Sequence, residues 1–195
     1  IPSAVCVDND DNIYVAGRTE STTNMTTSGA YQDTIIGTYN GFYNKYTRNG
    51  QRIYGTTYSS IREIFDIHCD KIDNIVISGR ATDDSSGTSG VFQPIRLSQK
   101  AGHVAKFNSA GNRIWATYFG EFNNNYFSLR SAIDTASAVI VAGETYTTLS
   151  TFVTSGTFQP TVPFIPAYFH SYLAKLDTAG ALVWGTFISS NQNTQ

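Results

Sequence analysis

A short hydrophobic strand that ends in glycine occurs three times in this chain, each time inside a larger matching block. The glycines are Gly17, Gly79 and Gly143, which are 62 and 64 residues apart. Self-similarity at such a period indicates copies of one supersecondary unit that bury a shared core by stacking. We therefore expect three units, at residues 1–60, 61–128 and 129–195.

Each unit shows the pattern of four short strands. β-Branched runs bounded by turn residues predict the first strands at 3–7, 65–69 and 129–133, and the second at 13–16, 75–78 and 139–142. A Thr-Ser-Gly-x-aromatic-Gln element follows at 27–32, 88–93 and 154–159. A hairpin then closes each unit, and its turn glycines, Gly50, Gly111 and Gly180, stand where a short loop needs positive φ. The last strand carries a repeated aromatic, at Tyr54, Trp115 and Trp184.

The third strand of each unit has apolar residues on both faces. One face alternates large and small side chains, as in His103, Ala105 and Phe107, and the other carries residues such as Val104. A sheet covered on both sides fits small antiparallel sheets stacked around an axis better than a two-layer sandwich. We expect an all-β chain of three four-stranded antiparallel propeller blades. Because closed propellers have about four to eight blades, the chain is a fragment of a larger propeller, part of a ring of several copies, or an open arc capped by partners.

These motifs resemble those of the bacterial seven-bladed β-propeller repeat family, abbreviated SBBP. The shared residues lie at 7–8, 13–17, 29–32, 105–111 and 184–186, and the likeness extends over nearly the whole chain. The chain departs from the family at Tyr54, which stands for Trp, at 134–138, which lacks the turn Gly or Asn, and in the long link 120–128. The resemblance implies secreted or cell-surface proteins of Bacteroidota, many of them exported by the type IX secretion system.

The composition excludes some classes of protein. The net charge is −2 and charged residues make up 14% of the chain, so no basic footprint for nucleic acid is present. No apolar run approaches the roughly 20 residues of a membrane span. Aligning the units puts Cys69 one residue out of step with Cys6, which points the two thiols to opposite faces of their strands. We therefore predict buried, inert thiols rather than a Cys6–Cys69 disulfide.

Two charged positions recur in every unit, as Asp8, Asp70 and Asp134 and as Lys45, Lys106 and Lys175. They are either a ring of ligand-binding charges or a structural ion pair repeated with the blade, and we favour the ion pair. Asp8, Asp10 and Asn12 resemble the start of a calcium loop. No Glu follows at the position of the EF-hand ligand, so a polar hairpin turn is the preferred interpretation, and we predict no metal and no cofactor.

The sequence shows no catalytic motif, and we predict that the protein is not an enzyme. His68 is the best candidate for a polar residue in a central channel, because Asp66 and Asp70 share its strand face. Aromatic residues in the connecting loops are weak candidates for ligand contacts: Tyr39, Phe152, Phe164, Tyr168 and Phe169. Short Asp-Thr-aliphatic triplets make Thr34, Thr135 and Thr178 weak candidates for O-glycosylation, by likeness to Bacteroidota exports.

Together these patterns predict a non-enzymatic extracellular propeller segment that serves as a binding or spacer module of a secreted or surface bacterial protein. The expected partners are other blades in the same or a second chain, a protein or glycan at the loops, and the secretion machinery. The alternative is a glycan-binding lectin propeller completed by oligomerisation.

Overall fold

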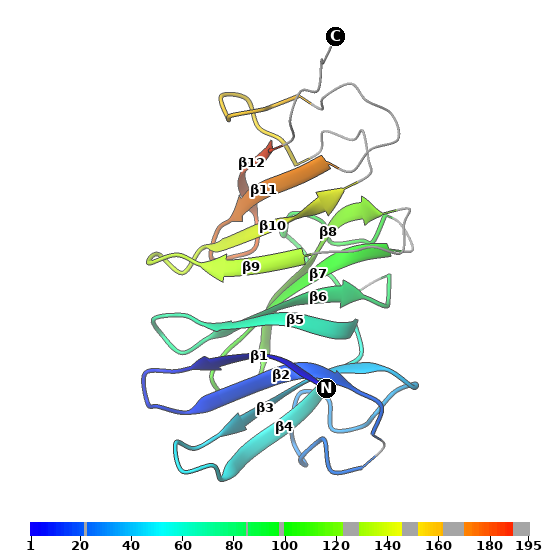
Figure 1. The fold of residues 1–195 in the computed structure, drawn as a ribbon, viewed down its shortest axis with the longest axis vertical. Coiled ribbons are helices and arrows are strands. Elements are labelled where there is room, and N and C mark those ends of the chain that lie inside the picture. Colours follow the sequence, from blue (N-terminus) through cyan, green and yellow to red (C-terminus); the bar gives the residue numbers. More distant parts are fainter. Residues whose placement is uncertain are drawn as a thin grey trace.

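The protein is a stack of three β-sheets (Figure 1). The computed structural model describes residues 1–21, 23–84, 86–97, 100–122, 129–145, 152–161 and 170–188. These residues form three four-stranded antiparallel sheets, each with its strands in chain order. Among them no helix is long and apolar enough to span a lipid bilayer. The all-β class and the four-stranded units predicted from the sequence are confirmed.

The strands extend the predicted segments by a few residues. Sheet 1 contains β1 (Pro2–Val7), β2 (Ile13–Thr19), β3 (Asn40–Tyr46) and β4 (Arg52–Tyr58). Sheet 2 contains β5 (Ile61–Cys69), β6 (Ile75–Ala81), β7 (Lys100–Phe107) and β8 (Arg113–Phe122). Sheet 3 contains β9 (Leu129–Ile133), β10 (Val139–Thr145), β11 (His170–Leu176) and β12 (Leu182–Phe187).

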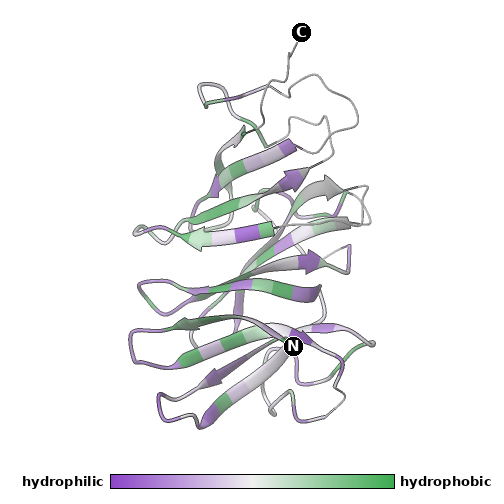
Figure 2. Cartoon of the chain, in the orientation of Figure 1, coloured by the Kyte–Doolittle hydropathy of each residue, from purple (hydrophilic) through white to green (hydrophobic). Residues whose placement is uncertain are grey.

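The hydrophobic core lies between successive sheets rather than within one layer. Tyr14 and Tyr43 of sheet 1 pack against Phe107 of sheet 2 in one cluster. Val104 of sheet 2 packs against Tyr172 of sheet 3 in the next cluster. Hydrophobic and polar residues accordingly both occur along the strands of each sheet (Figure 2). The middle sheet is covered on both faces, as its apolar third strand predicted.

The repeated glycine of the second strand is explained by a bulge in the neighbouring first strand. The register of β5 against β6 shifts between Ile61 and Glu63 and again between Ile64 and Asp66. The shift brings the Glu63 carbonyl so close to Gly79 that a Cβ there would overlap it. At Gly17 the Ile1 carbonyl takes the same place. At Gly17 and Gly79, glycine is therefore required by close backbone approach, as expected beside a bulge.

The Thr-Ser-Gly-x-aromatic-Gln element is bonded along the free edge of the fourth strand. In sheet 2, Thr88 N donates to Ala116 O at 2.9 Å, and Gln93 N donates to Thr117 Oγ1 at 2.9 Å. The equivalent bonds occur in sheets 1 and 3, from Thr27 to Gly55, Gln32 to Thr56, Thr154 to Gly185 and Gln159 to Thr186. The element thus satisfies backbone groups that an exposed edge strand would leave unpaired.

The repeated aromatic of the fourth strand joins each sheet to the next. Trp115 is buried, and its indole Nε1 donates to Thr178 O of sheet 3 at 2.8 Å. Its ring lies beside Gly180, and the Tyr54 ring lies beside Gly111 in the same way. Both turn glycines have positive φ, as predicted. The fourth-strand aromatics are therefore structural in sheets 1 and 2.

Cys6 and Cys69 form a disulfide, so the prediction of inert thiols is wrong. The bond joins β1 to β5, with a Cα–Cα distance of 6.1 Å. The two side chains do point to opposite faces of their own sheets. However, the three sheets are stacked in the same orientation, so one face of sheet 1 packs against the opposite face of sheet 2. Two cysteines on opposite faces of their own sheets therefore point toward each other across the contact, and the one-residue offset brings their sulfur atoms together. The one-residue offset between Cys6 and Cys69 therefore favours the disulfide instead of preventing it.

Candidate functional site

The repeated charges form one ion pair inside each sheet. Lys45 Nζ lies 3.1 Å from Asp8 Oδ2, and Lys106 Nζ lies 2.9 Å from Asp70 Oδ2. The third pair, Lys175 and Asp134, is 2.7 Å apart. Lys45 also lies over the Tyr14 ring at 5.0 Å, on the face that meets sheet 2. The geometry agrees with the preferred structural ion pair within each unit.

Each of these aspartates also caps the turn between the first two strands. Asp8 Oδ1 accepts hydrogen bonds from the backbone amides of Asp10 and Asn12. Burial alone would raise the pKa of Asp8, but the hydrogen bonds from Asn12 and Lys45 hold it below its usual value. The Asp8 carboxylate is thus occupied by Lys45, and no group of metal-ligating side chains occurs among the described residues. The calcium-like motif Asp8, Asp10 and Asn12 therefore forms a hairpin turn between β1 and β2.

Asp66 is bonded to residues of sheet 3 rather than to His68. Asp66 Oδ2 accepts a hydrogen bond from Ser131 N of sheet 3 at 2.9 Å, and Asp66 Oδ1 lies 3.3 Å from Arg130 Nη1. His68 Nε2 is buried and has no hydrogen-bond partner among the described residues. Asp70 is held by Lys106 and its own turn. The carboxylates beside His68 are therefore used to join sheets and to close a turn.

A polar cluster that the sequence did not indicate lies between sheets 1 and 2. His103 on β7 is fully buried, and its Nε2 lies 2.9 Å from the Tyr58 hydroxyl on β4. Nearby, Asp83 Oδ1 accepts hydrogen bonds from Ser86 Oγ at 2.8 Å and from the Tyr118 hydroxyl at 2.5 Å. The spacing of these residues along the chain gives no signal, because the fold brings them together from separate strands.

This cluster has the residue types of a Ser-His-Asp triad but not its geometry. A triad needs the serine hydroxyl hydrogen-bonded to the histidine. Here Ser86 Oγ is bonded to Asp83 and Tyr118, and His103 faces Tyr58. Burial lowers the pKa of His103 to about 3, an effect that Asp83 opposes and Arg113 strengthens. The imidazole is therefore neutral at pH 7, and the cluster joins two sheets.

Acid should destabilise the protein through His103. Its pKa is lower in the folded state than the ordinary value of about 6.5, so below that pH the unfolded chain binds more protons. We expect the free energy of unfolding to fall by about 1.4 kcal/mol per pH unit between about pH 6.5 and about pH 4.5. Urea unfolding of His103→Gln over this range should show a much flatter dependence. Equal slopes in the wild type and in His103→Gln would refute the assignment.

The predicted loop aromatics have different positions. Phe152 is buried in the core between sheets 2 and 3, where its ring lies 5.1 Å from that of Tyr172, so its prediction as an exposed ligand contact is wrong. A turn residue directly before a repeated motif can fold inward, which composition alone does not reveal. Phe164, Tyr168 and Phe169 lie outside the described residues. Thr34, Thr135 and Thr178 are all exposed, and their glycosylation remains a prediction.

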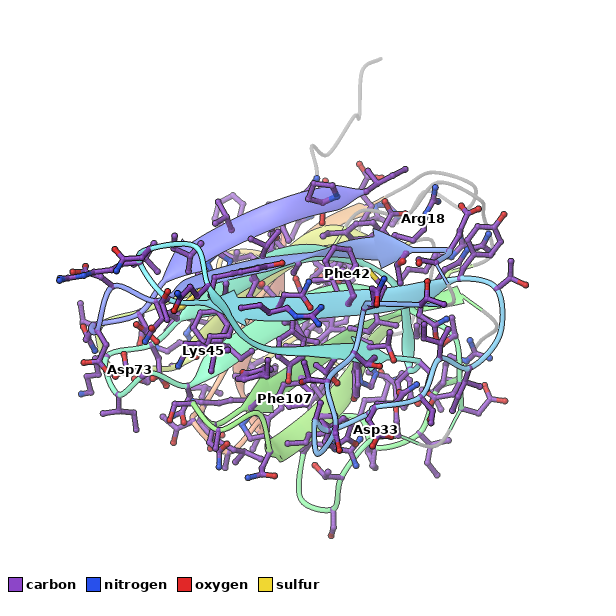
Figure 3. All side chains as sticks on the ribbon, turned by 90° about the horizontal axis from the view of Figure 1, so that it is seen from below. Arg18, Asp33, Phe42, Lys45, Asp73 and Phe107 are labelled. Carbon is purple, nitrogen blue, oxygen red and sulfur yellow. A yellow bond between two sulfur atoms is a disulfide. The ribbon has the colours of Figure 1, made fainter. Side chains whose placement is uncertain are left out.

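Arg18 lies at the opposite end of the strands from Lys45 (Figure 3), and Tyr39 lies beside Arg18 and Arg62. The Arg62 guanidinium is 4.2 Å from the centre of its ring, and that of Arg18 is 5.4 Å away. Arg18 is also close to Glu20, at 3.7 Å, and Glu63, at 3.9 Å. Stacking on an aromatic face holds a guanidinium in place while leaving its N–H groups free to donate.

An arginine pocket adjoins this group, and we use that name for the cavity of about 740 Å³ lined by Arg62, Arg80, Ala81, Thr82, Asp84, Arg96 and Leu97. Arg62 and Arg80 come from the paired strands β5 and β6, and Arg96 comes from the connection that leads to β7. Arg96 is ion-paired with Asp84. The sequence reasoning missed this pocket; its one available signal was that Arg18 and Arg80 directly follow a repeated glycine, whereas the third copy has Glu144.

Comparison with known proteins adds no assignment to this geometry: no model of a protein family matches the chain, and no curated protein matches it.

Proposed function

We propose that the chain is a non-catalytic segment of an extracellular β-propeller of the SBBP type, in which each sheet is one blade. It acts as a binding or spacer module of a secreted or cell-surface bacterial protein. The observation that carries the proposal is a comparison of equivalent positions in the three sheets. Residues that are exposed on the outer faces of sheets 1 and 3 have counterparts that are buried where two sheets meet. Further blades of the same kind are therefore the partners that fit these two faces.

The outer face of sheet 1 carries apolar residues that are exposed. Val5 on β1 is 64% exposed, whereas Ile67, at the equivalent place on β5, is 2% exposed because sheet 1 covers it. Tyr46 is likewise partly exposed where its counterpart Phe107 is fully buried. The same positions thus change from buried to exposed according to whether another sheet precedes them.

The outer face of sheet 3 shows the complementary change. The Asp70 side chain is fully buried where sheet 3 covers it, whereas the equivalent Asp134 is 27% exposed. Phe158, which stands where Tyr31 and Phe92 contact the following sheet, is 84% exposed. Exposed apolar surface of this kind marks an interaction site in a soluble protein.

The arrangement of the strands also fits propeller blades. β1 lies against β5, and β5 lies against β9, so the first strands of successive sheets are neighbours (Figure 1). In propellers the first strand of every blade lines the central axis, and the blades follow one another around it. This order supports an arc of consecutive blades.

The disulfide supports an extracellular location. Cys6–Cys69 joins two sheets, and such bonds form and persist in oxidising compartments. The SBBP resemblance adds Bacteroidota exports and the type IX secretion system as the source and route that fit. The repeated Asp–Lys pairs are engaged in internal hydrogen bonds, which supports a scaffold role for the repeat itself.

The end faces can be tested with the chain alone. The outer faces of sheets 1 and 3 should meet head to tail, as the inner faces do, so that mass rises with concentration in analytical ultracentrifugation. Val5→Arg should abolish this association, because it places a charge within the apolar contact. Ile53→Arg is the matched control, since Ile53 and its counterparts Ile114 and Val183 are exposed in all three sheets.

A chain that stays monomeric at all concentrations, or that associates equally well with Val5→Arg and Ile53→Arg, would contradict the proposal. Association that is lost only with Val5→Arg would support it.

A further inference from the structure

We propose that the arginine pocket binds an acidic oligosaccharide through its carboxylate or sulfate groups. The inference rests on the proposed function of a non-catalytic binding module and names the ligand class that one of its loop surfaces accepts. It is carried by the placement of Arg62, Arg80 and Arg96 in one cavity of a chain with a net charge of −2.

Two of the pocket's cations have no ion-pair partner among the described residues. Arg62 and Arg80 form no ion pair within the part of the chain that the structure describes. Arg96 lies beside Asp84, whose side chain is largely exposed and accounts for one of the three charges. The lining therefore carries a net charge of +2, although the chain as a whole is acidic.

Arg62 is held in position before any ligand arrives. Its guanidinium lies over the Tyr39 ring at 4.2 Å, and Tyr39 directly precedes β3. A guanidinium that is already stacked loses less side-chain entropy on binding a ligand than a mobile one does. Its planar N–H groups can also donate two parallel hydrogen bonds to a pair of carboxylate or sulfate oxygens. Tyr39, predicted from the sequence as a ligand contact, thus becomes a positioning residue for the arginine.

The pocket also breaks the symmetry of the repeat. Arg80 follows the repeated glycine, and its counterpart in sheet 1, Arg18, is near Glu20 and Glu63. The counterpart in sheet 3 is Glu144, which has the opposite charge. A residue retained only for blade packing would have the same environment in each copy. At this copy, two arginines that pair with no carboxylate in the described part of the chain point to a local ligand.

The size and lining of the pocket favour a sugar polymer over other polyanions. A volume of about 740 Å³ accommodates a short oligosaccharide rather than a single ion. Thr82 supplies a hydroxyl group, and Ala81 and Leu97 supply apolar surface beside the guanidinium groups. Nucleic acid binding draws on an extended basic stripe, whereas these cations are confined to one cavity. Acidic polysaccharide chains carry widely spaced carboxylate or sulfate groups that suit such a site.

The test measures binding of polygalacturonate and dextran sulfate to the intact chain, with neutral dextran as the reference, by isothermal titration calorimetry. We expect at least one of the two acidic polymers to bind, and comparison of them identifies carboxylate or sulfate as the preferred group. Arg62→Gln/Arg80→Gln should weaken binding by about tenfold or more, because it removes two charge-assisted contacts. Asp84→Asn should strengthen binding, since it removes the carboxylate that competes for Arg96.

The control is Arg48→Gln/Lys71→Gln, which removes the same charge at exposed turns on the opposite end of the strands and should leave the affinity unchanged. Equal weakening by both double variants would mean attraction to net charge alone, and would overturn the proposal. No binding of either polymer, or equally tight binding of polyglutamate or a single-stranded oligonucleotide, would also overturn it. Because Arg62 and Arg80 lie away from Val5 and the end faces, head-to-tail association tests the propeller proposal separately.

Discussion

Reduction of the Cys6–Cys69 disulfide is expected to lower the free energy of unfolding by about 4 kcal/mol. The bond joins residues separated by 63 positions, so it restricts a long loop in the unfolded chain. In a protein of this size, each kcal/mol corresponds to about 2–4 °C in melting temperature. Calorimetry with and without a reducing agent should therefore show a decrease of about 10 °C.

The matched control is the double variant Cys6→Ala/Cys69→Ala. It should melt near the temperature of the reduced wild type and should not respond to the reducing agent. A wild-type melting temperature that is unchanged by reduction would show that β1 and β5 are held together by packing alone. The two cysteines lie beside the inter-sheet core that contains Ile67 and Tyr14, so both contributions are present at this contact.

Much of the fold could be predicted from the repeat. β-Branched runs located the first and second strands of each sheet to within a few residues, since turn residues bound each run and the pattern occurs three times. The turn glycines have positive φ as predicted, and Trp115 shows what the repeated aromatic does in sheet 2: its indole bonds to the turn of the next sheet. Because the unit occurs three times, a residue type that recurs at the same position in each copy can be recognised as structural.

What could not be predicted depends on contacts between sheets. To predict the disulfide, one must know which face of β1 packs against which face of β5. The sequence shows which residues share a face of a strand, but not which other strand that face contacts. The close approach of the Glu63 carbonyl to Gly79 depends on a bulge that leaves no residue signature. Phe152 was predicted to be an exposed aromatic because it lies in a connecting loop, yet its ring completes a core.

The candidate site was harder to predict for a related reason. Tyr39 was singled out as an exposed aromatic, but the arginines around it come from β2 and β5, which are distant in the sequence. The arginine pocket and the His103 cluster both break the repeat, so the periodic pattern that predicted the fold carries no information about them. Function in a repeat protein is expected where the copies differ, and both sites occur in sheet 2 and its contact with sheet 1.

Lys106→Met should lower the free energy of unfolding by about 3 kcal/mol. The Asp70 carboxylate is fully buried, and its two oxygens are shared between Lys106 and the amides of Ile72 and Asn74. Burial alone would raise the pKa of Asp70, and the hydrogen bonds from Lys106 and Asn74 hold it below its usual value. Removing the ammonium group leaves a buried anion without its cation, which costs far more than an exposed pair contributes.

The third copy of the repeat provides the control for this prediction. Lys175→Met removes the same contact from Asp134 in sheet 3, where both side chains are more than a quarter exposed and water can solvate the remaining carboxylate. We expect a much smaller loss from Lys175→Met, measured by urea unfolding in parallel. The double variant Asp70→Asn/Lys106→Met should recover most of the loss, because no buried charge remains and the amide oxygen still caps the turn. Equal losses from the two lysine variants would show that the covering sheet does not set the strength of the pair, and would remove the strongest argument that the outer face of sheet 3 is built to be covered.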